Sequence, residues 1–362
     1  MSRSMKDANK RIFEVLDKFV QKSQVNVPVY NQNIRCIKTK EEDKEWLKEL
    51  KIIKEQPILP NFKTALFKFK NQKYFVAVGW QIQKVIDNTV IELVELNAGI
   101  VTALLCELKI SLNQKASPYD IANEIFYESE KEIIPYDFSV IANFYEPFSV
   151  YQIQEDSPFF EKDDQDLIRL SGFYALKNSQ LIALNFYQET REQFEKIFFE
   201  GSTNIPYENL LLSLVSVSWK YSFLDIYRCI ERLFSISLLE NFHQRFRIPD
   251  SLRNFSSELE SYIGWKPKEN EAINKLIDDS PEGASELLRE ASELLREIKK
   301  FLDGTEEGKC GDLIYKIRNS IVHFRLATQS IDLDDKHWDM LIRASLYIVE
   351  HWYNHYDEHL RM

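Results

Sequence analysis

The feature that most constrains the fold is a change of residue pattern at 201–206, GSTNIP. These residues are small and polar and end in proline, which is typical of a connection between domains. Before them, runs rich in aromatic and β-branched residues alternate with helical patterns, whereas almost all the chain after them has helical periodicity. With 362 residues the chain is long enough for two cores. We therefore predict an α+β protein with a mixed domain over 1–205 and an all-helical bundle over 206–362.

Both strands and helices are predicted in the first domain. Runs on either side of Asn71-Gln72 favour a β-hairpin. Ser117 is expected to cap a helix whose first position is Pro118. Strand-like runs occur at 64–70, 73–82, 88–96 and 179–187. Helical patterns occur at 1–24, 117–127 and 190–200.

The second domain is predicted to be an antiparallel bundle. Residues 209–246 form one long helix or two helices joined by a bend, and Gly264 ends the next one. A third helix opens at Pro281 and contains the heptad ASELLRE twice in succession, which lengthens the helix while keeping its apolar stripe on one face. A coiled coil would need more than two such repeats. The last helix is expected to run from about Asp334 to the end of the chain.

Composition narrows the classes of protein. A net charge of −11 argues against a chain that coats nucleic acid by bulk electrostatics. Four widely spaced cysteines, with no CxxC pair, favour neither a zinc site nor a disulfide framework. The N-terminus does not resemble a signal peptide, and the most apolar run, 210–219, is too short to span a bilayer. We expect a soluble cytoplasmic protein without membrane contact.

Polar side chains interrupt the segment YKIRNSIVHFR, residues 315–325. At about 100° per residue, its isoleucines and phenylalanine form one core-facing stripe with the preceding residues Leu313 and Ile314. Arg318, Asn319 and His323 are then predicted on the opposite, outward face. A cation, an amide and a group that titrates near neutral pH would lie together there.

This set of groups is suited to RNA cleavage. Histidine can take the proton of an attacking ribose 2′-OH or return one to the leaving oxygen. Guanidinium can bind the dianionic phosphorane through two parallel hydrogen bonds, and no metal is needed. Additional phosphate contacts are expected from Lys316, Arg325 and Arg343. The alternative interpretation is an ordinary solvated helix face.

Two other polar clusters have open interpretations. Tyr227, Arg228 and Glu231 either support the site or form an intrahelical ion-pair set. Histidines at positions 351, 355 and 359 have i, i+4, i+8 spacing, which could chelate zinc or nickel or could simply form a polar helix end. The sequence HWYNH lacks the glutamate of HExxH, so a metalloprotease is excluded. We assign no metal and no cofactor.

The stretch Arg318-Asn-Ser-Ile-Val-His323 resembles the R-x4–6-H signature of HEPN domains, which are metal-independent endoribonucleases in many toxins and phage-defence proteins. The context is similar, with the motif in the penultimate helix of an all-helical domain. The resemblance covers roughly 206–362 and implies a HEPN-like bundle. It implies that Arg318 and His323 are catalytic and that Asn319 orients them or the phosphate.

The resemblance also implies a symmetric homodimer that joins two facing motifs. Because two such motifs carry like charge, apolar contacts elsewhere must hold the dimer together. We expect them from the aromatic residues of the last helix, Trp338, Tyr347, Trp352 and Tyr353.

The predicted function is therefore cleavage of RNA by a toxin or antiviral effector. The N-terminal domain would sense an activating ligand or partner, or restrain the nuclease. Two alternatives stay open: a non-catalytic dimerisation or interaction module, and a regulator that binds a nucleotide phosphate through Arg318. No glycine-rich phosphate loop supports the last.

Overall fold

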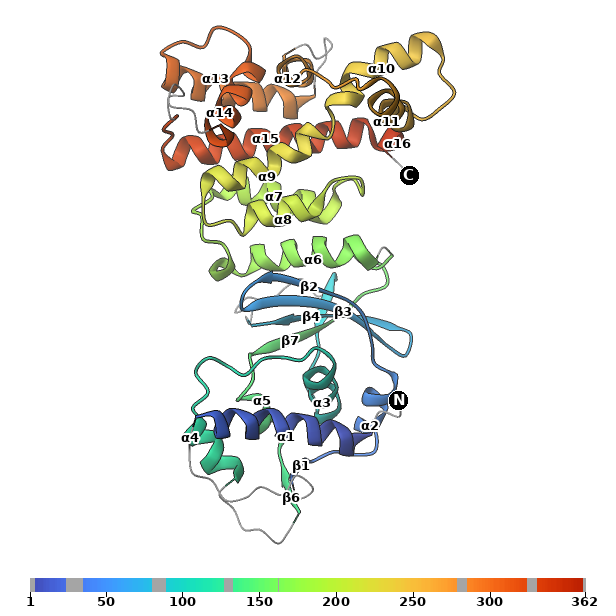
Figure 1. Cartoon of the computed structure of the whole chain (residues 1–362), viewed down its shortest axis with the longest axis vertical. Coiled ribbons are helices and arrows are strands. Elements are labelled where there is room, and N and C mark those ends of the chain that lie inside the picture. Colours follow the sequence, from blue (N-terminus) through green and yellow to red (C-terminus); the bar gives the residue numbers. More distant parts are fainter. Residues whose placement is uncertain are drawn as a thin grey trace. The chain divides into compact units, whose positions relative to one another are not determined.

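The chain divides into two compact units, Met1–Leu167 and Ile168–Met362, each described separately here (Figure 1). The computed structural model describes residues 4–23, 35–79, 89–126, 133–161, 163–278, 285–323 and 331–360. The boundary predicted at 205/206 falls inside the second unit. Helix α7 (Gln188–Glu200) and residues 168–177 of α6 (Asp163–Lys177) precede it and therefore belong with the helical part of the chain.

A five-stranded antiparallel sheet forms the centre of the first unit, in the order β2-β3-β4-β7-β5. Its strands are β2 (Lys51–Leu59), β3 (Phe62–Phe69), β4 (Gln72–Val78), β5 (Ile91–Leu93) and β7 (Phe148–Ile153). A separate parallel pair joins β1 (Arg35–Ile37) to β6 (Ile134–Tyr136). Strand β7 lies between β4 and β5, so both of its pairings join residues that are far apart in the sequence.

The predicted hairpin is present as β3 and β4, with its turn one residue earlier than expected. Phe69 pairs with Gln72, so the turn consists of Lys70 and Asn71. Lys70 adopts a left-handed φ of 54°, which supplies the turn geometry that a glycine would usually provide. Of the run 73–82, residues 80–82 lie outside the described residues, and the strand predicted at 88–96 is shortened to Ile91–Leu93.

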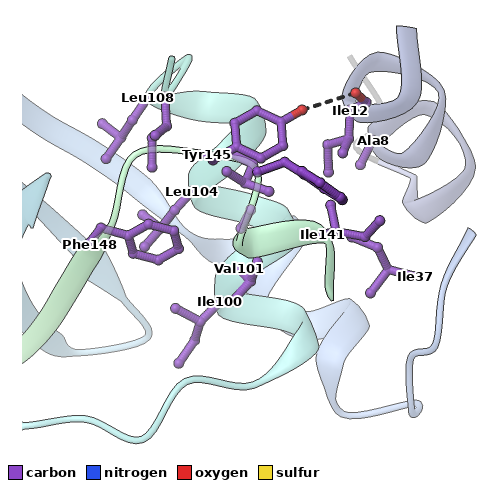
Figure 2. Close-up of a cluster of buried hydrophobic side chains, with 14 of the residues drawn as sticks. Ala8, Ile12, Ile37, Ile100, Val101, Leu104, Leu108, Ile141, Tyr145 and Phe148 are labelled. Carbon is purple, nitrogen blue, oxygen red and sulfur yellow. Dashed lines mark hydrogen bonds between the residues drawn. The ribbon is translucent and has the colours of Figure 1, made fainter. Parts of the chain in front are cut away.

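Helices cover one face of this sheet and form the main core of the unit. They are α1 (Met5–Lys22), α2 (Asp43–Glu49), α3 (Ala98–Glu107), α4 (Pro118–Ile121), which continues as a π-helical segment over Ala122–Phe126, and α5 (Phe138–Ala142). Ser117 caps α4 as predicted, accepting from the Asp120 amide. Figure 2 shows Val101 and Leu104 of α3 beside Ile141 and Phe148.

Helix α3 was not predicted. Eight of its ten residues are buried, so it is apolar on all sides and has no amphipathic period to recognise. Tyr145 lies beside it and donates a 3.0 Å hydrogen bond to the Ile12 carbonyl of α1 (Figure 2). This buried bond connects two elements that are far apart in the sequence.

The second unit is helical throughout most of its described residues. After α7 come α8 (Tyr207–Leu214), α9 (Trp219–Glu231), α10 (Phe234–Phe246), α11 (Leu252–Ile263), α12 (Glu269–Ile277), α13 (Glu286–Asp303), α14 (Cys310–Val322), α15 (Asp335–His355) and α16 (Asp357–Leu360). The one or two helices predicted over 209–246 are thus three helices, α8, α9 and α10. Ser216 bonds to the backbone of Ser218 in both directions, and such local bonds compete with helix formation at the first break.

Two further predictions need correction. The strand expected at 179–187 is wrong: a short 3-10 turn over Ser179–Leu181 is followed by irregular chain, and the Tyr187 amide donates to Asp339 instead of to a strand. The last helix was expected to offer its aromatic side chains to a partner chain. Trp338, Trp352 and Tyr353 are instead buried in the protein's own bundle, where α15 packs against α7, α9 and α13.

Residues 286–297 of the duplicated heptad lie in α13, where they extend a single amphipathic stripe. Leu288, Leu295 and Ile298 are buried, and α13 packs on α15. Pro281, where this helix was expected to open, lies outside the described residues. Gly264 ends α11 in the left-handed conformation that the sequence predicts. The protein is therefore α+β, with a sheet-containing N-terminal unit and a helical C-terminal one. No helix within the described ranges is long and apolar enough to cross a membrane.

The Tyr145 hydrogen bond gives a test of the N-terminal core. Tyr145→Phe keeps the ring and removes the donor, so we expect the amides of α1 to lose about 1 kcal/mol of protection. Hydrogen exchange followed by mass spectrometry on the full chain measures this loss. The matched control is Tyr119→Phe, because that side chain is 66% exposed. Equal protection of α1 in the two variants would contradict a stabilising role for the bond.

Candidate functional site

Helix α14, which carries the predicted motif, is fixed at its start by α12. The Asp278 carboxylate, directly after α12, accepts from the amides of Cys310 and Gly311, both at 2.9 Å. An anion at this position accepts hydrogen bonds from amides that have no partner within the helix. Its charge also interacts favourably with the positive end of the helix dipole. A Cβ on Gly311 would collide with Asn274 of α12, so glycine permits the close approach of the two helices.

The apolar stripe predicted for α14 is confirmed in its first half. Leu313, Ile314 and Ile317 are buried, whereas Ile321 is only half-buried. Phe324, expected to complete the stripe, lies outside the described residues.

The helix ends at Val322, earlier than predicted. His323 follows it with φ −107° and ψ 98°, an extended conformation, while its amide still donates to the Asn319 carbonyl at 3.0 Å. Its side chain is therefore not stacked over Asn319 on a continuing helix face. His323 is exposed, and no described residue hydrogen bonds to its ring.

Arg318 does not lie on an outward face, which corrects the helical-wheel prediction. Its side chain is only 17% exposed. Nη1 donates to Asn319 Oδ1 at 2.9 Å and lies 3.4 Å from Glu269 Oε2. Nη2 lies 4.0 Å from Glu231 Oε1, and the guanidinium carbon is 5.6 Å from the centre of the Tyr227 ring. Two carboxylates and an aromatic ring therefore surround this cation.

Of the three residues predicted to support the site, two reach Arg318. Tyr227 and Glu231 contact it from α9, so they do not form only an intrahelical set. Arg228 is 61% exposed and pairs with Asp225 at 2.6 Å, which is the intrahelical pairing of the alternative interpretation.

The carboxylate nearest to Arg318, Glu269, was missed by the sequence analysis. It is the first residue of α12, a nine-residue helix that was not predicted, and nothing in the local sequence connects it to the motif. Tyr227 is buried, and its hydroxyl lies 3.4 Å from Glu269 Oε2. Burial, followed by the charge of Glu269, raises the pKa of Tyr227 above its usual value. The hydroxyl is therefore protonated at neutral pH and donates to Glu269.

Two of the three cations predicted to bind RNA phosphate have carboxylate partners within the protein. Lys316 pairs with Asp303 at 3.0 Å, and Arg343 of α15 lies 3.7 Å from Glu189. Arg343 is largely buried, and its Nε has no hydrogen-bond partner in the described structure. Arg325 lies outside the described residues. A phosphate at either described cation would have to displace a carboxylate.

The three C-terminal histidines have different surroundings. His351 shares a 2.8 Å hydrogen bond with Ser285, and His355 lies 3.7 Å from Glu240. His359 belongs to α16, so the i, i+4, i+8 series does not continue on one helix. Burial, with a smaller effect from His355, lowers the pKa of His351. Among the described residues, no three metal-binding side chains gather in one place.

Comparison with known proteins adds no family assignment. No protein-family model, curated protein or solved structure matches this chain. The HEPN resemblance therefore depends on the motif and its helical context, and the catalytic roles of Arg318, Asn319 and His323 stay predictions.

The contacts of Arg318 predict a measurable effect on stability. Arg318→Ala leaves Glu231 and Glu269 without their shared cation and should destabilise the helical unit by about 1–2 kcal/mol, the typical cost of an unpaired polar group at a partly buried site. Urea unfolding followed by circular dichroism measures the difference. Arg228→Ala is the matched control, since exposed pairs contribute little. An equally small effect of both changes would show that the Arg318 contacts are not stabilising.

Proposed function

We propose that the protein is a metal-independent endoribonuclease of a toxin or antiviral defence system, with Arg318, Asn319 and His323 as its catalytic residues. One observation carries the proposal: Asn319 bonds to both of the others. Its side-chain oxygen accepts from Arg318 Nη1, and its backbone oxygen accepts from the His323 amide. One residue in the last turn of α14 thus bonds to the guanidinium and to the backbone of an exposed histidine.

The proposed reaction forms a bond between the ribose 2′-oxygen and phosphorus and breaks the bond from phosphorus to the 5′-oxygen. The imidazole of His323 accepts the 2′-OH proton, and a second acid protonates the leaving oxygen. Arg318 stabilises the negative charge that develops on the phosphorane. The products are a 2′,3′-cyclic phosphate and a 5′-OH end. The proton taken from the 2′-OH is matched by the proton given to the 5′-oxygen, and the reaction includes no oxidation or reduction.

Arg318 has donors for this role even while it is paired. In the described structure neither its Nε nor its Nη2 group makes a hydrogen bond. The contact of Nη2 with Glu231, at 4.0 Å, is too long for one. A phosphate that reaches them would compete with Glu231 first and with the closer Glu269 next. The two carboxylates would then lower the affinity of the empty site for anions and help to restrict it to RNA that other contacts hold in place.

The second acid is the reason to propose a homodimer. One histidine cannot accept a proton and donate another in the same step, whereas a second copy of α14 supplies a second His323. A two-fold axis near this residue would place both imidazoles at one phosphate. The apolar surface for such a dimer does not come from Trp338, Trp352 or Tyr353, since these are buried within one chain.

A second candidate function is a non-catalytic interaction module built on the same bundle. The observation in its favour is the half-buried position of Arg318 between Glu231 and Glu269, which is also what a structural arginine requires. In that case the N-terminal unit would carry the recognition and the helical unit would only dimerise or dock a partner.

Cleavage of RNA in EDTA distinguishes these functions. We expect the protein to cut total RNA to products with 2′,3′-cyclic phosphate ends, and His323→Ala to lower the rate by about 100-fold or more, as is typical for loss of a general base or acid. Arg318→Lys, which keeps the charge but not the planar fork, should also lose most activity. His355→Ala changes another exposed histidine and should cut normally. Full activity of His323→Ala, with correct folding, would refute its catalytic role.

Mixing two inactive variants tests the shared site. Chains with Arg318→Ala and chains with His323→Ala should regain a small part of the activity when mixed, because a heterodimer then holds one arginine and one histidine at the same phosphate, with water in place of the second acid. Each variant mixed only with itself is the control. Light scattering over a dilution series should show that activity falls together with the dimer. A protein that cleaves RNA as a strict monomer would contradict the two-chain site.

A further inference from the structure

A cluster of exposed aromatic rings lies where α10 meets α11. Phe242 and Phe246 of α10 are 49% and 60% exposed, and Phe255 of α11 is half-buried beside them. The ring centres of Phe242 and Phe246 are 4.4 Å apart, and the rings of Phe242 and Phe255 are nearly parallel at 6.1 Å. The two helices pack on each other at one end of the helical unit (Figure 1).

Three arginines accompany these rings. Arg245 and Arg247 are exposed and Arg253 is half-buried, and Arg245 lies over the Phe246 ring at 6.0 Å. No carboxylate of the described residues comes within 4.0 Å of any of these guanidinium groups. Asp250 is the one acidic residue between Phe242 and Phe255. In a chain with a net charge of −11, this corner is a local excess of positive charge.

The conformation of the corner is held by the chain itself. Arg247 takes the left-handed conformation that ends α10, with φ 50° and ψ 48°, and His243 bonds to the Asp250 carbonyl at 2.6 Å. Ser251 then caps α11. The rings and the arginines are thus presented by one defined turn and not by a loose loop.

We propose that this corner, Phe242–Phe255, is a binding platform for single-stranded RNA. Exposed aromatic rings stack with bases of any sequence, and unpaired guanidinium groups bind the phosphates between them. A second copy of this chain is a poorer occupant, because it would bring three more arginines against these three. Duplex RNA is also poorer, since its bases are stacked on each other and not available to the rings.

The platform and the proposed active site lie on the same helical unit and are connected by a short stretch of chain. Residues 264–268 lead from α11 directly to Glu269, the closest carboxylate to Arg318. As a docking site for substrate the platform rests on the proposed ribonuclease activity, but RNA binding by itself does not. It would hold RNA on the same helical unit as a site whose own cation is offset by two carboxylates.

The test measures binding without cleavage. Full-length His323→Ala protein in EDTA is titrated into a labelled oligouridine of about 12 nucleotides, and fluorescence anisotropy gives the affinity. Phe242→Leu with Phe246→Leu keeps apolar character and should weaken binding about tenfold through loss of stacking. Arg245→Gln with Arg247→Gln should make the negative slope of log affinity against log salt less steep by about 1.4. Tyr221→Leu with Arg228→Gln, an exposed aromatic and an exposed arginine of α9, should bind normally.

The outcomes distinguish a failure of the proposed RNA-binding platform from a failure of the proposed ribonuclease activity. If both platform variants bind as tightly as the control, or if duplex RNA competes as well as the oligouridine, the platform is refuted, even when the unmodified protein cleaves RNA. Self-association that the phenylalanine variants abolish, without any RNA binding, would likewise refute it in favour of a protein interface. Binding that depends on these residues supports the platform even if the unmodified protein cuts no RNA, a result that would refute the ribonuclease alone.

Discussion

The candidate site depends on the antiparallel contact between α12 and α14. Asp278 at the end of α12 binds the first two amides of α14, Asn274 in the middle donates to Asp312, and Glu269 at the start of α12 meets Arg318 near the far end of α14. These contacts follow one helix pair from end to end. They determine how α14 is placed, and therefore where the guanidinium and the histidine after it are held.

This arrangement gives Arg318 structural contacts, and the proposed function gives it a chemical role as well. Its pairing with Glu269 and its place over Tyr227 stabilise the bundle, while its free donors are those a phosphate would need. An acidic protein that acted on RNA, as we propose, would have to provide local positive charge against an unfavourable overall field. The proposed platform between α10 and α11 would meet that need by a different route, because its arginines are exposed or half-buried and have no nearby carboxylate among the described residues.

Much of the local structure could be predicted because its causes are local. The spacing of Ile314 and Ile317, the Ser117 cap, the glycine that ends α11 and the β3–β4 hairpin each follow from residues a few positions apart. Helices α3 and α12 escaped prediction for opposite reasons. The first is apolar on every side, and the second is short and polar at its start, so neither has a clear amphipathic period over enough residues.

The sequence by itself determined the division into a mixed α+β part and a helical part, and the amphipathic helices of the second. It also determined the close succession of Arg318, Asn319 and His323. The tertiary structure decided which way those side chains turn. The early end of α14 takes His323 off the helix, and carboxylates from α9 and α12 draw Arg318 inward. A helical wheel assumes a continuous helix with water on its polar face. Partners that come from other helices, many residues away, are not visible in it, so the surroundings of the cation could be learned only from the folded chain.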